Sequence, residues 1–173
     1  MPGEAIAEIM RQHRDDAEVQ AAGCLALHQK ICDEQLGLDA AVAVSLAVAA
    51  LRDHTGDMHT QYYGIQLLGQ IAHQFRTEQT TIVDAGAVQL IMTALRQHPD
   101  GAQMQDCGYT AIARLLDMSE DDDEHWTDIP FSSDSQVKMP VFRAIATADA
   151  AALLEVTQAR FPDDEDLQKV TAA

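Results

Sequence analysis

The sequence has few basic residues. Its 28 Asp and Glu against 11 Lys and Arg give the 173-residue chain a formal net charge of −17. Such a charge repels phosphate backbones and anionic lipid surfaces, so we expect binding neither to nucleic acid nor to a membrane. A basic protein partner remains open, although an acidic surface also serves solubility alone.

Cysteine is scarce as well, with three residues at Cys24, Cys32 and Cys107. They form no CxxC pair and match no metal-ligand spacing. Cys24 and Cys32 lie eight positions apart on one expected helix, too far for a disulfide unless the helix bends. We therefore expect buried or half-buried free thiols in a reducing compartment, which indicates a cytoplasmic protein.

The chain also lacks long apolar runs and the usual motifs of catalysis. The longest run, residues 40–51, is interrupted by Ser45 and is too short to cross a bilayer. The N-terminus has neither the basic start nor the apolar core of a signal peptide. No serine lies in a glycine-flanked elbow, and no glycine-rich loop could cradle a phosphate. We therefore predict no catalytic residue, no metal and no cofactor.

What the chain does contain is an internal repeat. Residues 86–116 have the apolar spacing of two amphipathic helices, with a break at residues 98–101 where Pro99 cannot continue a helix. An Arg-x-His triplet at 96–98 matches triplets at 52–54 and 11–13. Each triplet is followed by a Gln and, three residues later, a Gly: Gln20 and Gly23, Gln61 and Gly64, Gln105 and Gly108. The glutamines are 41 and then 44 residues apart, and a helical period in this range is typical of armadillo or HEAT arrays.

The amino-acid sequence of the unit resembles the armadillo motif G-A-[IV]-x-x-[LI]-[IV]-x-A-L-R-x-H-P-x-x-x-x-[VM]-Q. The matching residues are Gly86-Ala87-Val88, Leu90-Ile91, Ala94-Leu95-Arg96, His98-Pro99 and Met104-Gln105. The resemblance implies an all-α fold, a right-handed α-solenoid of three to four armadillo-like repeats with partial terminal repeats. We expect a single domain over residues 1–173, with repeats at about 4–36, 37–76, 77–118 and 137–173 and an acidic surface loop at 118–140.

Within the repeats, the apolar periodicity and the breaks predict individual helices. Asp15 or Asp16 is expected to cap the second helix, and Gly37 marks the break before the next unit. The expected helices before residue 86 span residues 4–13, 16–33, 40–53, 58–75 and a short 77–84.

Two groups of residues could suggest a metal site. His13, His54 and His98 repeat at one position of successive units, but equivalent residues in a solenoid lie about 10 Å apart, so we expect a structural role. Residues 117–128 place acids at four positions of a calcium loop, yet Asp122 stands where an EF-hand requires Gly. We expect a solvated loop there, with a weak cation site as the alternative. Apolar residues within it, Trp126, Ile129 and Phe131, would pin the loop to the body or face a partner.

The armadillo resemblance implies that the last helix of each unit lines a concave groove. Nuclear-import members carry Trp and Asn ladders on that helix, but the register here places Leu25, Gln66 and Thr110 in the Trp row. Gln29, Gln70 and Arg114 occupy the Asn row, so binding of import signals is not supported. The candidate partner-binding patch on this face consists of Tyr62, Gln66, Gln70, His73 and Arg114.

We therefore predict a non-enzymatic protein–protein interaction module, or a scaffold subunit of a larger complex, that binds a protein partner on the concave helix face. The alternative is a helical-repeat enzyme or lyase-like protein that holds a small ligand in the groove. Cys32, His73 and Asp117 would be the residues of that alternative.

Overall fold

The computed structural model describes residues 1–115, and in this part every regular element is a helix. The predicted helix boundaries are confirmed to within one or two residues. The fourth repeat and the acidic loop, together with Trp126, Ile129 and Phe131, lie outside the described residues. The elements are α1 (Gly3–Gln12), α2 (Ala17–Cys32), α3 (Ala40–Asp53), α4 (Met58–Gln74), the 3₁₀ turn η1 (Arg76–Glu78), α5 (Gln79–Asp84), α6 (Ala87–Gln97) and α7 (Ala102–Leu115).

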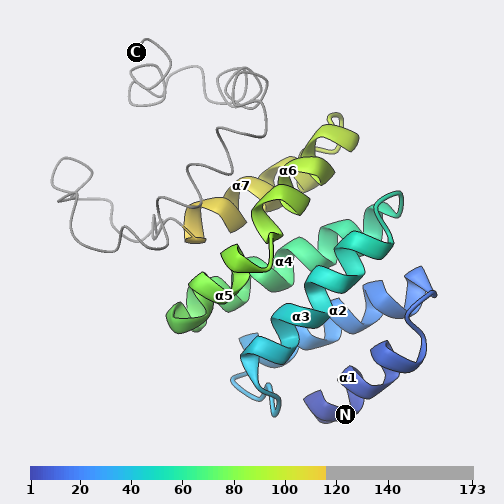
Figure 1. Cartoon of the computed structure of the whole chain (residues 1–173), viewed down its shortest axis with the longest axis vertical. Helices are drawn as coiled ribbons and strands as arrows, with labels where there is room; N and C mark the ends of the chain where they lie inside the picture. Colours follow the sequence, from blue (N-terminus) through green and yellow to red (C-terminus); the bar gives the residue numbers. More distant parts are fainter. Residues whose placement is uncertain (116–173) are drawn as a thin grey trace, which may run out of the picture.

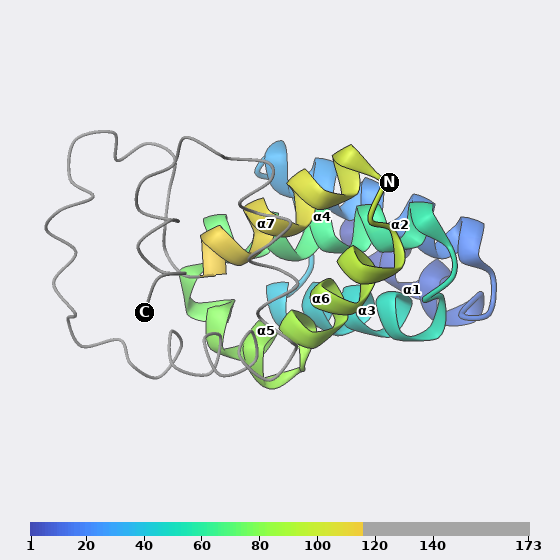
Figure 2. The same cartoon turned by 90° about the horizontal axis from the view of Figure 1, so that it is seen from above.

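The helices form two layers (Figure 2). One layer contains α2, α4 and α7, with α4 in the middle, where it packs against α2 on one side and α7 on the other. The other layer contains α1, α3, α5 and α6, and faces the viewer in Figure 1. Helix α3, in the second layer, packs against one side of α4. The opposite side of α4 therefore faces away from the second layer and is not covered by it. We call the free side of the first layer the α2–α4–α7 face.

Helices α2, α3 and α4 each begin after an aspartate whose side chain accepts a hydrogen bond from a backbone N–H group of the first turn. Asp16, rather than Asp15, caps α2 by accepting hydrogen bonds from the backbone N–H groups of Glu18 and Val19. Asp39 and Asp57 cap α3 and α4 in the same way. These caps fix where each helix begins, and so fix which residues reach the α2–α4–α7 face.

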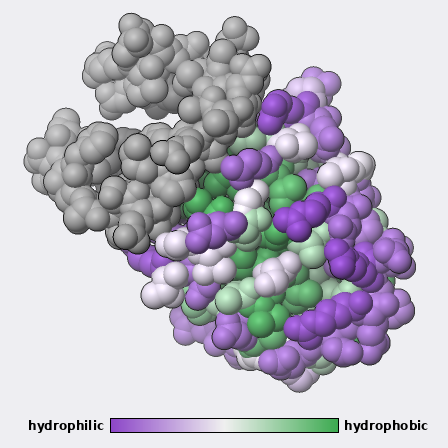
Figure 3. Space-filling model, viewed as in Figure 1, coloured by the Kyte–Doolittle hydropathy of each residue, from purple (hydrophilic) through white to green (hydrophobic). Residues whose placement is uncertain are grey.

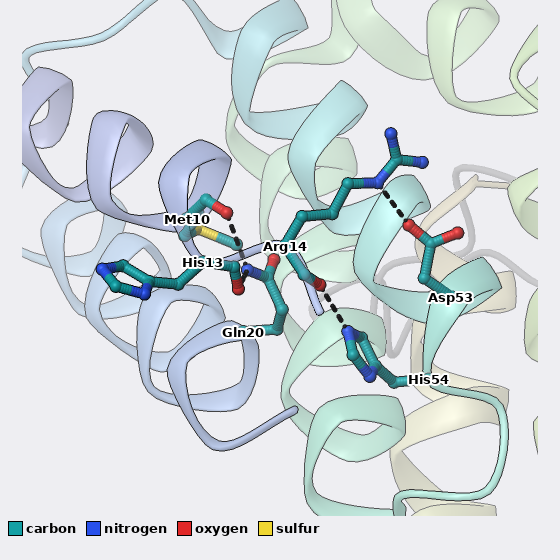
Figure 4. Close-up of polar contacts among 6 residues, drawn as sticks. All are labelled: Met10, His13, Arg14, Gln20, Asp53 and His54. Atoms are coloured by element: carbon teal, nitrogen blue, oxygen red, sulfur yellow. Dashed lines mark hydrogen bonds and ion pairs between the residues drawn. The ribbon is translucent and has the colours of Figure 1, made fainter. Parts of the chain in front are cut away.

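The repeated glutamine has one structural role in all three units. Gln61 lies on α4 and is buried, and its Nε2 donates to the carbonyl oxygens of Leu51 at 2.8 Å and His54 at 3.0 Å. Gln20 makes the same pair of bonds to Met10 and His13 (Figure 4), and Gln105 makes them to Leu95 and His98. The acceptors are carbonyls that the end of the preceding helix leaves without intrahelical donors. Each glutamine therefore fastens its own helix to the end of the helix before it.

The repeated glycine and histidine complete this joint. A Cβ on Gly64 would lie 2.8 Å from Leu51 Cδ2, so the glycine allows α3 and α4 to approach closely. His13, His54 and His98 are the C-cap residues of α1, α3 and α6, with similar backbone angles. The His54 ring also bonds the Arg14 carbonyl at 2.8 Å, and Arg14 Nε donates to Asp53 at 2.7 Å, which links one unit to the next (Figure 4).

The hydrophobic core lies between the two layers. Helix α3 has no charged residue from Ala40 to Leu51 and supplies much of that core. Apolar residues also form a central band on the outside of the second layer, bordered by polar ones (Figure 3). Within residues 1–115, no helix is long and apolar enough to span a membrane. The largest of the fully buried core side chains are Met10, Leu27, Ile31, Leu51, Ile65, Leu67, Leu68, Ile71, Ile82, Ile91, Met92 and Met104.

Candidate protein-interaction surface

Helix α4 presents a single stripe of partly or fully exposed side chains on the α2–α4–α7 face. Tyr62, Gln66 and Gln70 are half-buried and His73 is exposed, whereas the residues between them are mostly buried. Their spacing of three to four residues places them on one side of an α-helix. With Arg114 of α7, they form what we call the α4–α7 strip.

The first part of the strip centres on Tyr62. Gln66 Nε2 donates to the Tyr62 hydroxyl at 2.9 Å, and the Tyr62 ring packs edge-on against Tyr63 with centroids 5.2 Å apart. The Cys107 thiol of α7 donates to the Tyr62 carbonyl at 3.7 Å. Burial raises the pKa of Tyr62, and the neighbouring Cys107 adds to the shift. The phenol therefore stays protonated at neutral pH, and its O–H can donate to a partner while its oxygen accepts from Gln66.

The second part joins α4 to α7. Arg114 Nη1 donates to Gln70 Oε1 at 3.1 Å, and both side chains are half-buried. This contact pairs two residues that the repeat register places 44 positions apart in the same row. The structure thus brings Tyr62, Gln66, Gln70 and Arg114 onto adjacent helices of one face. His73 lies one turn beyond Gln70, near the end of α4, and none of the hydrogen bonds found within residues 1–115 joins it to the other four.

Sequence reasoning missed His28, which lies on α2 close enough for the Arg114 charge to affect it. Burial lowers the pKa of His28, and the positive charge of Arg114 lowers it further. The repeat register could have indicated His28. Its equivalent on α4, 41 residues later, is Gly69, which has no side chain to occupy the same position. Both ring nitrogens of His28 lie within about 4.0 Å of the Cys32 sulfur.

The expectation that all three cysteines are buried or half-buried is wrong for Cys32, which is exposed at the end of α2. All three are free thiols, and Cys24 is buried while Cys107 is half-buried. The position of Cys32 in the last turn of α2, next to the solvated α2–α3 connection, explains its exposure. Burial raises the pKa of both Cys24 and Cys107 to about 12, so these two thiols stay protonated.

The two pockets found among the described residues do not bring the residues of the small-ligand alternative together. Two pockets, of about 590 Å³ and 520 Å³, lie at the α1–α2 turn and between the α2–α3 connection and the end of α4. Neither pocket contains Cys32 or His73, and Asp117 lies outside the described residues. In residues 1–115, no three His, Cys, Asp or Glu side chains are grouped closely enough to hold a metal ion.

Comparison with known proteins identifies the family. Residues 4–128 match the family described as Protein zer-1 homolog-like, C-terminal domain. No curated protein and no solved structure matches the chain. The family match covers all of the described helices except the first residue of α1, including every residue of the α4–α7 strip. The chain therefore belongs to the zer-1 homolog-like C-terminal domain family.

Proposed function

We propose that this chain is a non-enzymatic protein-interaction module that recognises a protein on the α4–α7 strip. Its helices would form a right-handed α-solenoid of armadillo-like repeats, with the α2–α4–α7 face as the concave side. We further propose that it acts as a substrate-recognition adaptor within a larger assembly. Zer-1-like proteins are adaptors in ubiquitin ligase complexes, which supports this role at the level of the family.

The contact between Gln70 and Arg114 is the observation that carries the placement of the binding surface. It joins side chains of two helices on the face that the armadillo resemblance assigns to partner binding. The other strip residues offer donors and acceptors beside an aromatic ring, a composition that suits recognition of a polypeptide.

The chemistry of the chain supports further parts of this proposal. The net charge of −17 favours a protein partner over nucleic acid or a membrane surface, and a basic partner is compatible with it. Three free thiols are compatible with a reducing compartment, and we propose a cytoplasmic location.

The test is to compare capture of partners by the wild type and by a variant carrying Tyr62→Ala, Gln70→Ala and Arg114→Ala. Each tagged protein is incubated with a soluble extract of the source organism, and retained proteins are quantified by mass spectrometry. We expect a stoichiometric partner to be retained by the wild type and lost by the variant. Circular dichroism should show unchanged helicity, because all three side chains are only half-buried; Tyr62 packs against the core, so thermal unfolding is measured as well.

A matched control variant carries three alanines on the opposite layer, at Glu8 of α1, Arg52 of α3 and Gln89 of α6, which are all exposed. It should retain the partner as the wild type does. Equal capture by all three proteins would refute the placement on the α4–α7 strip. Loss of the partner in the control alone would move the binding surface to the α1–α3–α6 side.

A further inference from the structure

Arg114 has no acidic partner among residues 1–115, although acidic residues are abundant there. Residues 1–115 contain 14 Asp and Glu against seven Lys and Arg, so acids outnumber bases two to one in the described part. The ion pairs found there join Arg11 to Glu8 and Arg14 to Asp53. No carboxylate of residues 1–115 forms such a pair with Arg114, whose guanidinium contacts the neutral amide of Gln70 instead.

The position of Arg114 is fixed by two glutamines. Gln70 accepts one of the five guanidinium N–H donors, and no other hydrogen bond from this guanidinium is found within residues 1–115. Gln79, which begins α5 and is buried, donates to the Arg114 carbonyl at 3.2 Å and to the Ala72 carbonyl at 3.3 Å. The backbone of Arg114 is therefore fastened to the end of α4, and its side chain to the middle of α4.

None of the groups found near this guanidinium within residues 1–115 pairs with it as an anion. His28 and the Cys107 thiol both lie within reach of the Arg114 charge, and neither carries a negative charge at neutral pH. Asp106 is on the same helix but eight residues earlier, a distance of about 12 Å along an α-helix. Within residues 1–115, the Arg114 guanidinium is thus a positive charge with no carboxylate paired to it, on a chain whose net charge is −17.

We propose that Arg114 and Gln70 form a carboxylate-binding subsite for an acidic side chain of the partner polypeptide. This inference rests on the proposed function, since it assigns a ligand to one part of the α4–α7 strip. The guanidinium can bind a carboxylate through two parallel N–H donors, with the Gln70 amide beside it as a further donor.

A single half-buried arginine matches the single charge of a carboxylate better than the double charge of a phosphate group. The net charge of the chain also limits the partner, because a strongly acidic segment would be repelled as it approached. The partner segment is therefore one in which an isolated Asp or Glu lies among neutral or basic residues.

The experiment uses pools of nine-residue peptides with amidated C-termini and flanking positions randomised over uncharged residues. The central residue is Glu in one pool, Gln in the second and Lys in the third. Immobilised full-length protein is incubated with an equimolar mixture, and retained peptides are quantified by mass spectrometry. We expect the Glu pool to be enriched about five- to tenfold over the Gln pool, the range of one charge-assisted hydrogen-bonded contact.

Two variants test the assignment to Arg114. Arg114→Gln should abolish the preference between the Glu and Gln pools, and Arg114→Glu should favour the Lys pool. Equal retention of the Glu and Gln pools by the wild type would refute the subsite, as would an unchanged Glu preference in Arg114→Glu. Retention of none of the pools would also refute it.

Two further pools identify the source of the anion. One has a central Gln and a free C-terminal carboxylate, and the other has a central phosphoserine. Stronger enrichment of either pool than of the Glu pool would overturn the assignment to an acidic side chain. The proposed function is judged separately by the triple-alanine variant. If the triple-alanine variant loses the partner and the wild type shows no preference for the Glu pool, the interaction surface is supported and the carboxylate subsite is refuted.

Discussion

Replacement of Gln61 by methionine should destabilise the protein by about 2–4 kcal/mol. Methionine has nearly the same length and volume as glutamine, so packing is preserved while both N–H donors are lost. The Leu51 carbonyl lies in a buried environment and would lose its partner there, which costs about 1–3 kcal/mol. The His54 carbonyl is only partly buried and still accepts the Asp57 backbone N–H at 3.1 Å, so the loss there costs no more than about 1 kcal/mol.

The assay is urea unfolding followed by circular dichroism at 222 nm, with thermal unfolding as a second measure. A cost of this size corresponds to a fall of about 5–15 °C in Tm for a chain of this length. Gln105→Met should show a similar cost, because Gln105 makes the same two bonds with nearly the same distances. The control is Gln29→Met on the exposed side of α2, which should change stability by less than about 0.5 kcal/mol. A Gln61→Met variant no less stable than this control would refute the role of the repeated glutamine.

Three further predictions follow from the titratable groups. The hydrogen bond from the Thr60 backbone N–H lowers the pKa of Asp57 in the folded state. The charged Asp57 cap therefore stabilises the fold at pH values above the unfolded-state pKa of about 3.9. This stabilisation is lost as the pH falls through the lower folded-state pKa. Asp57→Asn keeps an oxygen at the cap but carries no charge, so its unfolding free energy should be lower than that of the wild type at pH 7, and the difference should shrink as the pH falls below about 3.9, measured by urea unfolding. Arg114→Gln should raise the pKa of His28 in an NMR titration but leave it below 6.5, because burial remains the larger cause of the shift; an unchanged pKa would show that the two residues are not close. In the native protein, a maleimide reagent should modify Cys32 much faster than the other two cysteines, and in urea all three should react; equal labelling in the native state would contradict the burial described here.

The repeat register is what allowed the sequence to predict so much of the described fold. Helix α3 was predicted at residues 40–53, which are its observed bounds, because its run of apolar residues lies between the break at Gly37 and a turn that contains Gly56. The same register predicted that Gln70 and Arg114 occupy one row, and the structure shows them in contact. Whether the α4–α7 strip binds a partner stays a prediction.

Other features could not be predicted because they do not repeat or depend on the packing of distant segments. Gln79 holds the ends of α4 and α7 together, but no equivalent contact recurs among the described units, so the repeat gave no signal for it. The exposure of Cys32 depends on how the chain leaves α2, which periodicity does not determine. The pKa of His28 is lowered first by burial and then by Arg114. Arg114 is 86 positions away in the sequence and comes close only through the stacking of helices.

The double hydrogen bond of the repeated glutamine has a consequence for how the chain can vary in length. In all three units the acceptor carbonyls lie seven and ten residues before the glutamine, so an insertion or deletion between them would break both bonds. No such constraint applies between one unit and the next, and there the spacing changes from 41 to 44 residues as η1 and α5 are added. The turn of each helix hairpin, from the first acceptor carbonyl to the glutamine, therefore has a fixed length, and family members should differ in length outside it.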